Sequence, residues 1–336
     1  MITRNSLIIL VSTLFLSLMI NCSNDSGINT NTKLSVGIQV SPAMTLVMVA
    51  KDKGFFERAG VDVEIVEFTA GKFALQAFLG GSLDIAISGE VPVALSILQG
   101  NKFRVLAQVV ERTINECRVV AHREENLNTP EEYFNQKKRR LATSFGGGPE
   151  FFTYNFLKKH NISSNQIELI SQRPEDMPAS LINGTVDAIS IFDPQARIAE
   201  IKMSDKGITF ADADIYSELY VVDVWQKTIN EKSKQLESFL KGLYDAQFFI
   251  RDFPEESKKI LMKYTKLDKQ IVDDIWENFV FKPAINNLFV NYTTAQAKWA
   301  IEKGTFPNDT EIPNYKNVLY PSMLKQIDSS SVTLNN

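Results

Sequence analysis

The sequence is poor in the residue types that most often carry catalysis and bind metals. Its 336 residues include two histidines, His122 and His160, and two cysteines, Cys22 and Cys117. A structural zinc site takes four Cys or His ligands at close spacing, and no such cluster occurs in the sequence. We therefore expect no metal centre, no cofactor and no enzymatic activity. His160 ends the segment FFTYNFLKKH, where a histidine commonly caps a helix.

Cysteine is also too scarce for a disulfide framework. If Cys22 is modified, as argued below, Cys117 is the only thiol left in the chain. It lies in the apolar run CRVVAH, and we interpret it as a small buried hydrophobic residue rather than a nucleophile. The protein must then be stabilised by its core alone.

An excess of charge of one sign is missing as well. The net charge is −4, from 40 acidic and 36 basic residues that are interspersed along the chain. Such a balance gives no reason to expect binding to nucleic acid or to anionic lipid. The one basic cluster, KKRR at residues 137–140, follows the helix-start pattern TPEEYF, in which Thr129 is a predicted N-cap and Pro130 the first helical residue. We interpret this cluster as the solvated end of that helix.

The longest apolar run, residues 7–20, is short. About 14 residues are too few to cross a bilayer core of roughly 30 Å, but they suit a signal peptide, which also explains Arg4 before the run. Cys22 and the polar stretch that follows resemble a bacterial lipoprotein signal, with Asn21 where such signals usually have Gly, Ala or Ser. This predicts a signal peptide over residues 1–21, a lipidated Cys22 and a flexible tether over 22–32. An ordinary signal peptide or an uncleaved anchor with an incidental cysteine is the alternative.

From residue 33 the chain alternates between short runs typical of strands and longer helical stretches, which predicts an α/β fold with parallel sheets. A first series begins with LSVGIQV and ends with LDIAIS, and a second begins with RRLATSF and ends with VDAISIF. The helix that contains Met48, Ala50 and Lys51 is expected to end near Gly54 or Gly60. After ITFAD and one more strand, SELYVVDVW, we expect a helical tail without strands that packs back on the first unit.

The two series end in the same pattern. GGSLDIAISGE at residues 80–90 and INGTVDAISIFD at 182–193 each read Gly, Ser or Thr, Leu or Val, Asp, and then a short apolar run. We interpret both as a helix end, a tight turn and a buried strand. Asp84 and Asp187 are expected to accept backbone hydrogen bonds there.

Ligands of open parallel sheets bind beyond the carboxyl ends of the strands, and these ends therefore supply the candidate site. The residue types there are small polar residues, glycines, a few charges and two aromatic rings, those of Phe145 and Phe192, which suit a small polar ligand. The predicted ligand-binding residues are Gln39, Ser41, Pro42, Thr69, Gly71, Ser88, Gly89, Glu90, Arg112, Ser144, Phe145, Gly146 and Asp193.

Two of these positions carry specific expectations. The GGGP at residues 146–149 could hold an anion at a helix N-terminus, but it lacks the Lys-Ser/Thr of a nucleotide P-loop. Glu90 follows a buried strand and needs a cation, which either the ligand or Arg112 would supply. We favour the ligand, and therefore an amine- or pyrimidine-like solute slightly over a sulfonate.

Several of these segments, taken together, resemble a known family. They are the Ser-Pro-Ala turn at residues 41–43, AKDKGFF at 50–56, the loop Thr69-Ala70-Gly71, the repeated junctions and Asp193-Pro194. The chain resembles the NMT1/THI5-like solute receptors of sulfonate, taurine, nitrate and thiamine-precursor importers. The resemblance implies a two-lobed periplasmic-binding-protein fold of type II, with a ligand cleft between the lobes. Lobe I would take residues 33–112, lobe II 113–220, and 221–328 would return to lobe I.

The same resemblance implies the function. A monomeric receptor, held to the outer face of a membrane through Cys22, would close on a small organic solute by a hinge motion and deliver it to an ABC permease and its ATPase. Two alternatives remain open: a ligand sensor without transport, and an enzyme on the same fold. Fungal pyrimidine synthases use a Cys-rich motif and a histidine that this sequence lacks, and menaquinone-pathway enzymes are not exported lipoproteins. The solute is either pyrimidine- or amine-like, or of the sulfonate and nitrate type.

Overall fold

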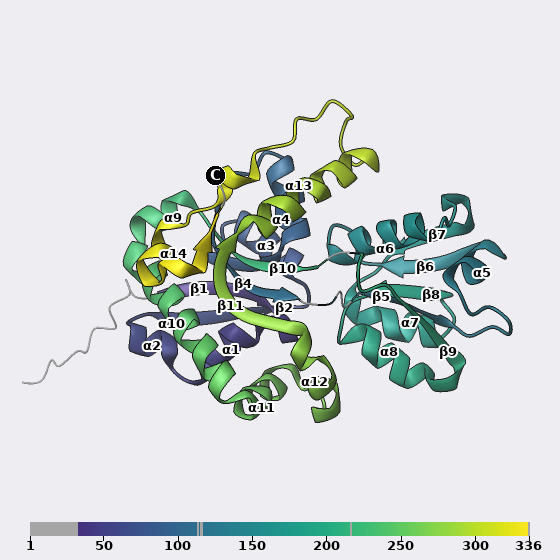
Figure 1. Cartoon of the computed structure of the whole chain (residues 1–336), viewed down its shortest axis with the longest axis horizontal. Helices are drawn as coiled ribbons and strands as arrows, with labels where there is room; N and C mark the ends of the chain where they lie inside the picture. The colour runs from purple at the N-terminus through teal and green to yellow at the C-terminus, as the bar shows by residue number, and fades with distance from the viewer. Residues whose placement is uncertain (1–32, 113, 115–116, 216, 335–336) are drawn as a thin grey trace, which may run out of the picture. The chain divides into compact units, whose positions relative to one another are not determined.

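The computed structural model describes residues 33–334 except 113, 115, 116 and 216. The predicted signal peptide, the tether and Cys22 lie outside the described residues. Within the described part of the chain, no helix has both the length and the apolar character needed to cross a membrane. The strands of this part form two sheets, each with its own helices (Figure 1).

The first sheet has seven strands in the order β12-β11-β4-β10-β3-β1-β2. Its members are β1 (Lys33–Gln39), β2 (Asp62–Phe68), β3 (Ile85–Gly89), β4 (Arg104–Arg112), β10 (Leu219–Val224), β11 (Phe279–Asn286) and β12 (Val332–Thr333). β1 runs parallel to β2 and β3, whereas β10 runs antiparallel to β3 and β4. We call this sheet and its helices the first lobe.

The helices of the first lobe come from both ends of the described chain. They are α1 (Thr45–Asp52), α2 (Phe55–Ala59), α3 (Gly71–Leu79), α4 (Glu90–Leu98), α9 (Gln226–Glu231), α10 (Ser233–Asp252), α11 (Pro254–Thr265), α12 (Lys269–Ile275), α13 (Asn287–Glu302) and α14 (Ser322–Ile327). Gly54 and Gly60, with φ of 67° and 95°, stand on either side of α2 in the left-handed conformation that ends helices, as predicted.

The second lobe is a five-stranded sheet of order β7-β6-β8-β5-β9 with its helices. Its strands are β5 (Arg118–His122), β6 (Arg139–Thr143), β7 (Ile167–Ser171), β8 (Ala188–Ile191) and β9 (Gly207–Ala211), and its helices are α5 (Pro130–Asn135), α6 (Gly148–Lys159), α7 (Met177–Ile182) and α8 (Gln195–Met203). The chain thus passes from one lobe to the other after β4 and returns after β9.

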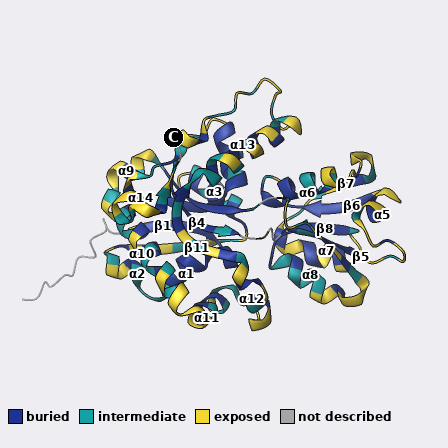
Figure 2. Ribbon diagram, viewed as in Figure 1, coloured by how far each residue is buried: buried dark blue, intermediate teal, exposed yellow. Residues whose placement is uncertain are grey.

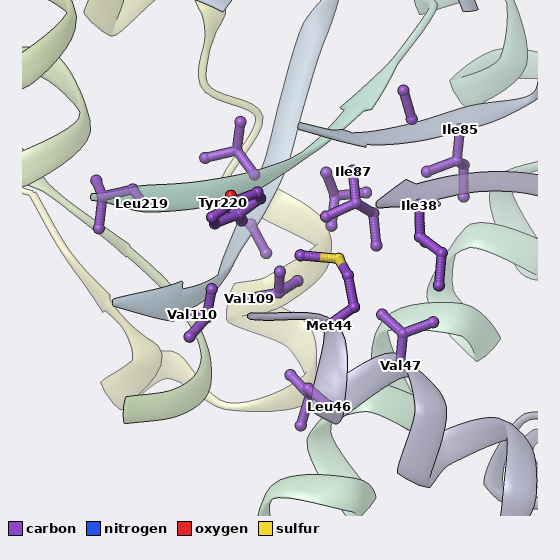
Figure 3. Close-up of a cluster of buried hydrophobic side chains, with 14 of the residues drawn as sticks. Ile38, Met44, Leu46, Val47, Ile85, Ile87, Val109, Val110, Leu219 and Tyr220 are labelled. Atoms are coloured by element: carbon purple, nitrogen blue, oxygen red, sulfur yellow. The ribbon is translucent and has the colours of Figure 1, made fainter. Parts of the chain in front are cut away.

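Each lobe has its own apolar core, because each sheet buries both faces. Burial is concentrated on the strands and on the inner faces of the helices (Figure 2). Figure 3 shows part of the first core, where side chains of α1 and its preceding turn meet those of the strands: Met44, Leu46, Val47, Ile38, Ile85, Ile87, Val109, Val110, Leu219 and Tyr220. Cys117, in the second core, is 1% exposed and packs as a small apolar residue, as predicted.

The repeated junction has the same structure in both lobes. Asp84 accepts a hydrogen bond through Oδ2 from the backbone N–H of Ser35 (3.0 Å) and donates its own N–H to the Ser35 carbonyl (3.1 Å). Asp187 makes the same pair with Arg140, at 2.7 and 2.9 Å. Each aspartate therefore joins the start of its strand to the neighbouring strand, which confirms that both accept backbone hydrogen bonds.

Three expectations about elements need correction. The C-terminal tail, expected to have no strands, contains β11. Pro283 interrupts the strand pattern in the sequence, and the pairing with β4 shifts in register between Phe281 and Ala284. β10 begins at Leu219 in the first sheet, and the boundary expected after residue 220 therefore falls inside a strand.

The basic cluster at residues 137–140 is the third correction, because it is not a solvated helix end. Thr129 caps α5 as predicted, with a capping box to Glu132, but α5 ends at Asn135 and β6 begins at Arg139. The Arg139 side chain is 1% exposed, pairs with Glu124 (2.5 Å) and lies 4.0 Å over the ring of Tyr133. An ion pair and an aromatic ring thus stabilise in the interior a residue that the sequence predicts to be exposed.

Candidate functional site

A cavity lies between the two lobes, at the carboxyl ends of their parallel strands. From the first lobe it is lined by Gln39 at the end of β1, by Ala70, Gly71 and Lys72 after β2, and by Gly89, Val91 and Pro92 at and after the end of β3. The second lobe contributes Ser144, Gly147, Gly148 and Pro149 after β6, and Phe192 after β8. Glu218 and Tyr220, where the chain enters β10, complete what we call the interlobe cavity.

The interlobe cavity is narrow in this structure. Its volume is only about 30 Å³. That is room for water rather than for an organic molecule. A solute therefore needs the lobes to part or a lining side chain to move.

Three helices begin at this cavity. The residues just before α3, α4 and α6, namely Ala70, Gly89 and Gly147, all line it, and none carries a side chain that could accept the first helical N–H groups. The N-terminus of a helix has a partial positive charge and attracts anions. One of these amides, Gly71 N–H, donates to Gln39 Oε1 at 2.9 Å.

Lys72 brings a full positive charge to the same place. Its Nζ donates to Ser144 Oγ (2.9 Å) and to the carbonyl oxygen of Phe145 (2.7 Å), and the side chain thus crosses from the first lobe to the second. Burial lowers the pKa of the Lys72 ammonium, although the carboxylates of Glu150 and Glu175 oppose the shift. The two oxygen acceptors of Lys72 are neutral. An anion that replaced them would form a stronger, charge-assisted hydrogen bond with the ammonium.

An ion pair between Arg112 and Glu218 lies at another side of the cavity. Arg112 is 1% exposed, and its Nη1 lies 3.7 Å from Oε2 of Glu218, which lines the cavity. The Arg112 guanidinium also lies 4.1 Å over the ring of Phe279. Arg112 thus acts behind the wall, where its charge offsets that of Glu218.

Glu90 does not face the cavity, contrary to the expectation from its sequence position. It is fully buried, and its carboxylate accepts hydrogen bonds from Leu219 N–H (2.8 Å) and from Gln296 Nε2 (2.8 Å). Burial raises the pKa of Glu90 to about 7 despite these hydrogen bonds. The groups that bond the Glu90 carboxyl therefore come from β10 and α13, which lie far away along the sequence, and not from Arg112.

Four of the predicted site residues line the interlobe cavity: Gln39, Gly71, Gly89 and Ser144. Three others lie beside the lining. Ser88 Oγ donates to Asp223 at 2.5 Å inside the sheet, Gly146 N–H donates to Glu150 at 2.7 Å, and Phe145 is 36% exposed. The cradle expected at residues 146–149 thus contributes Gly147, Gly148 and Pro149, while Glu150 of the same helix holds Gly146.

The remaining predicted residues have other positions. Asp193 pairs with Arg118 (2.8 Å), Thr69 is exposed, and Ser41 and Pro42 are buried at the start of α1. Phe192, which the sequence places at a strand end, lines the cavity, whereas Lys72, Glu218 and Tyr220 were not predicted. Lys72 directly follows Gly71, a predicted strand-end residue, and one more residue there would have included it. Glu218 and Tyr220 precede or begin an antiparallel strand, a position that a rule based on parallel strands does not cover.

The described residues contain no set of three or more His, Cys, Asp or Glu side chains placed to bind a metal ion. His122 Nε2 lies 2.7 Å from the carbonyl of Leu181, and His160 lies between Glu131 and Asp212. Neither histidine is among the residues that line the interlobe cavity.

Comparison with known proteins supplies a family. The model of a family described as NMT1/THI5 like matches residues 41–257. The chain belongs to the NMT1/THI5-like family. A putative aliphatic sulfonates-binding protein of Bacillus subtilis is 25% identical over 281 residues, which cover 82% of each chain. A putative thiamine biosynthesis protein of Haemophilus influenzae is 22% identical over 289 residues, or 82% of this chain and 88% of its own.

Solved structures show that this NMT1/THI5-like chain has the two-lobed fold of periplasmic binding proteins. The alkanesulfonate-binding protein SsuA of Xanthomonas axonopodis, solved with MOPS bound, has a TM-score of 0.73 at 18% identity and covers 86% of this chain and 98% of its own. The nitrate-binding protein NrtA of Synechocystis has a TM-score of 0.72 at 14% identity and covers 89% of each. The desulfurization enzyme DSZB also matches, with a TM-score of 0.62 at 12% identity over 88% of this chain and 98% of its own. The fold thus serves binding proteins and an enzyme.

Proposed function

We propose that the protein is the solute-binding component of an ABC importer and captures a small organic anion in the interlobe cavity. The observation that carries this proposal is the convergence of three helix N-termini and the Lys72 ammonium on one cavity, with contributions from both lobes. The names of the relatives support it, since one is a putative aliphatic sulfonates-binding protein and structural neighbours bind an alkanesulfonate or nitrate.

The charge distribution favours an anion over the amine- or pyrimidine-like solute suggested by Glu90. The Glu90 carboxyl is occupied by Leu219 and Gln296, and Arg112 offsets Glu218. Lys72 and the helix N-termini then set the sign of the cavity. A sulfonate or similar oxyanion would accept hydrogen bonds from Lys72 and from helical N–H groups on both lobes, and would thereby hold the lobes together.

We further propose that the solute leaves unchanged, although an enzyme shares the fold. The residues that line the interlobe cavity, all of them described, include neither cysteine nor histidine. Histidine is the side chain that most often transfers protons in catalysis, and it often serves as the base that activates a nucleophile. Binding without chemistry needs only the amides and side chains that the cavity offers.

The experiment is a thermal-shift and calorimetric screen with ethanesulfonate, taurine, nitrate and an aminopyrimidine. Binding to the native state raises stability by RT ln(1 + [L]/Kd), and a true ligand therefore raises Tm. We expect an anion to bind, and Lys72→Gln to weaken its binding by about 1.5–3 kcal/mol, or roughly tenfold to a hundredfold. Lys102→Gln, on an exposed loop of the same lobe, is the control. Binding of the aminopyrimidine alone, or an unchanged affinity of Lys72→Gln, would contradict the proposal.

For its place in the cell we propose a lipid anchor at Cys22 that holds the monomer on the outer face of a membrane, next to a permease and its ATPase. The support is the short apolar run and the polar tether around Cys22 in the sequence. Cys22→Ser should shift the protein from the membrane fraction to the soluble fraction. Recovery of the unmodified N-terminal peptide of the wild-type protein by mass spectrometry would rule out the anchor.

A further inference from the structure

A second cavity lies between α6 and the strand β7 of the second lobe, and Lys303 of the first lobe also lines it. Its volume is about 460 Å³, compared with about 30 Å³ for the interlobe cavity. Its apolar wall is formed by the side chains of Leu157, Ile162, Ile167 and Leu169. We call it the α6–β7 cavity. Its size and its largely apolar wall are those of a small-molecule site.

The wall is partly exposed, at Leu169 on the edge strand β7. β7 pairs with β6 on one side only, at the end of the five-stranded sheet. Ile167 and Leu169 are two residues apart and point to the same face of the sheet, and Leu169 is 40% exposed. Aliphatic side chains that line a hollow at a sheet edge would lose their contact with water if an apolar molecule filled the space.

Positive charge borders this apolar wall. Lys158 and Lys303 both line the cavity, together with a single carboxylate, that of Glu150. Lys303 already forms an ion pair with Glu150, whereas the side chain of Lys158 is 66% exposed and lies 4.0 Å from the equally exposed Glu302. Because exposed pairs at this distance are weak, Lys158 remains able to bind another anion.

We propose that the α6–β7 cavity binds a small amphipathic anion, with an aliphatic tail against Leu157, Ile167 and Leu169 and an acid group near Lys158 and Lys303. The tail accounts for the apolar wall, and the acid group accounts for the two lysines at its border. A neutral apolar molecule would use only the wall, and a short polar anion only the lysines. The combination of the two selects the chemical class.

This site is separate from the one proposed for the transported solute. The residues that line the α6–β7 cavity and those that line the interlobe cavity have no member in common. A variant of one cavity can therefore be tested for binding in the other. Failure of the proposed transport function would leave this inference untouched, and the reverse also holds.

Calorimetric titration of the full chain with octanoate and, in parallel, with 1-octanol tests the inference. We expect one octanoate to bind per chain, and to bind more tightly than 1-octanol, because only octanoate carries the charge that the lysines complement. Leu169→Glu, which places a carboxylate in the wall at a position exposed enough to tolerate it, should weaken octanoate binding about tenfold or more. Lys158→Gln should weaken it a few-fold.

The matched control is Ile201→Glu, which puts the same charge on a 54% exposed aliphatic position of α8 in the same lobe. It should bind octanoate like the wild-type protein, and so should Lys72→Gln in the interlobe cavity. The proposal is overturned if the wild-type protein does not bind octanoate at millimolar concentration, if 1-octanol binds equally well, or if Leu169→Glu and Ile201→Glu behave alike. It is also overturned if Lys72→Gln abolishes octanoate binding, because the anion would then occupy the interlobe cavity.

Discussion

Glu90 is a fully buried carboxyl whose ionisation affects the stability of the fold. The pKa of an unperturbed glutamate is 4.5, and burial raises that of Glu90 to about 7. Below pH 4.5 the group is protonated in both the folded and the unfolded chain. Between pH 4.5 and 7 the folded chain keeps a proton that the unfolded chain has lost, and stability from this group therefore falls as the pH rises, by about 3 kcal/mol in all.

Glu90→Gln should remove this pH dependence. The glutamine can still accept from Leu219 N–H. Gln296 Oε1 has no hydrogen-bond partner among the described residues, and its amide can rotate to receive the new NH₂ group. Urea unfolding at pH 5 and pH 8 should show the variant gaining on the wild-type protein at the higher pH. The exposed Glu125→Gln serves as control. A difference between variant and wild type that stays constant with pH would show that Glu90 does not titrate in this range.

His160 should act in the same direction as Glu90 but at higher pH. Its Nδ1 lies 2.6 Å from Glu131 and its Nε2 2.5 Å from Asp212, which also pairs with Lys159. Burial lowers the pKa of the imidazole, but the hydrogen bonds and the charges of both carboxylates outweigh burial and raise it above the usual 6.5. The charged imidazole therefore stabilises the fold fully below pH 6.5, and this stabilisation is lost as the pH rises through the raised pKa.

His160→Gln is then expected to lower the free energy of unfolding at pH 6 and to have a smaller effect at pH 9. Unfolding curves at the two pH values measure this, with His122→Gln as control, because the ring of His122 meets a backbone carbonyl rather than carboxylates. An equal loss of stability at both pH values would mean that only the neutral hydrogen bonds of His160 matter.

At the level of elements, the repeated junctions are predicted to be equivalent in energy as well as in structure. Asp84→Ala removes the acceptor of Ser35 N–H and the partner of Lys232, and Asp187→Ala removes the acceptor of Arg140 N–H. Each change should cost about 1–3 kcal/mol, because a partly buried donor loses its acceptor. Ser82→Ala and Thr185→Ala, at exposed positions of the same pattern, are the matched controls. Equal stability of the aspartate variants and these controls in urea unfolding would contradict the assigned role.

Elements that depend on local signals could be predicted from the sequence. The glycines around α2, the capping residue Thr129 and the two junctions act within a few residues of chain or between neighbouring strands, and their patterns are therefore readable. β11 was missed because its signal is interrupted by Pro283, and only pairing with β4 makes it a strand.

Side chains whose surroundings come from distant segments could not be placed in this way. Arg139 is buried because Glu124 and Tyr133 receive it, and Glu90 is buried because β10 and α13 bring Leu219 and Gln296 to it. The strand-end rule found the edge of each sheet where the interlobe cavity lies. It could not tell which side chains at that edge turn inward.

For the whole molecule, side chains of the two lobes contact each other directly. Lys303, which follows α13, pairs with Glu150 of α6, and the rings of Trp299 and Phe151 on the same two helices meet edge to face at 5.2 Å. Lys72 adds its hydrogen bonds to Ser144 and Phe145. Glu150 also holds Gly146 N–H, next to the glycines that line the interlobe cavity. The Lys303–Glu150 ion pair thus links the loop at residues 146–148 of the second lobe to the first lobe.

Lys303→Gln is therefore expected to loosen the contact between the two lobes. Small-angle scattering should give a larger radius of gyration than for the wild-type protein, and saturating solute should restore the compact form, because solute contacts both lobes. Apparent solute affinity should fall by roughly two- to tenfold, the cost of closing without the ion pair at about 0.5–1.4 kcal/mol. Lys298→Gln, an exposed lysine of the same helix, should change neither quantity. If scattering and affinity of Lys303→Gln equal those of Lys298→Gln, the ion pair does not control the cleft, and closure must rest on Lys72 and the aromatic contact.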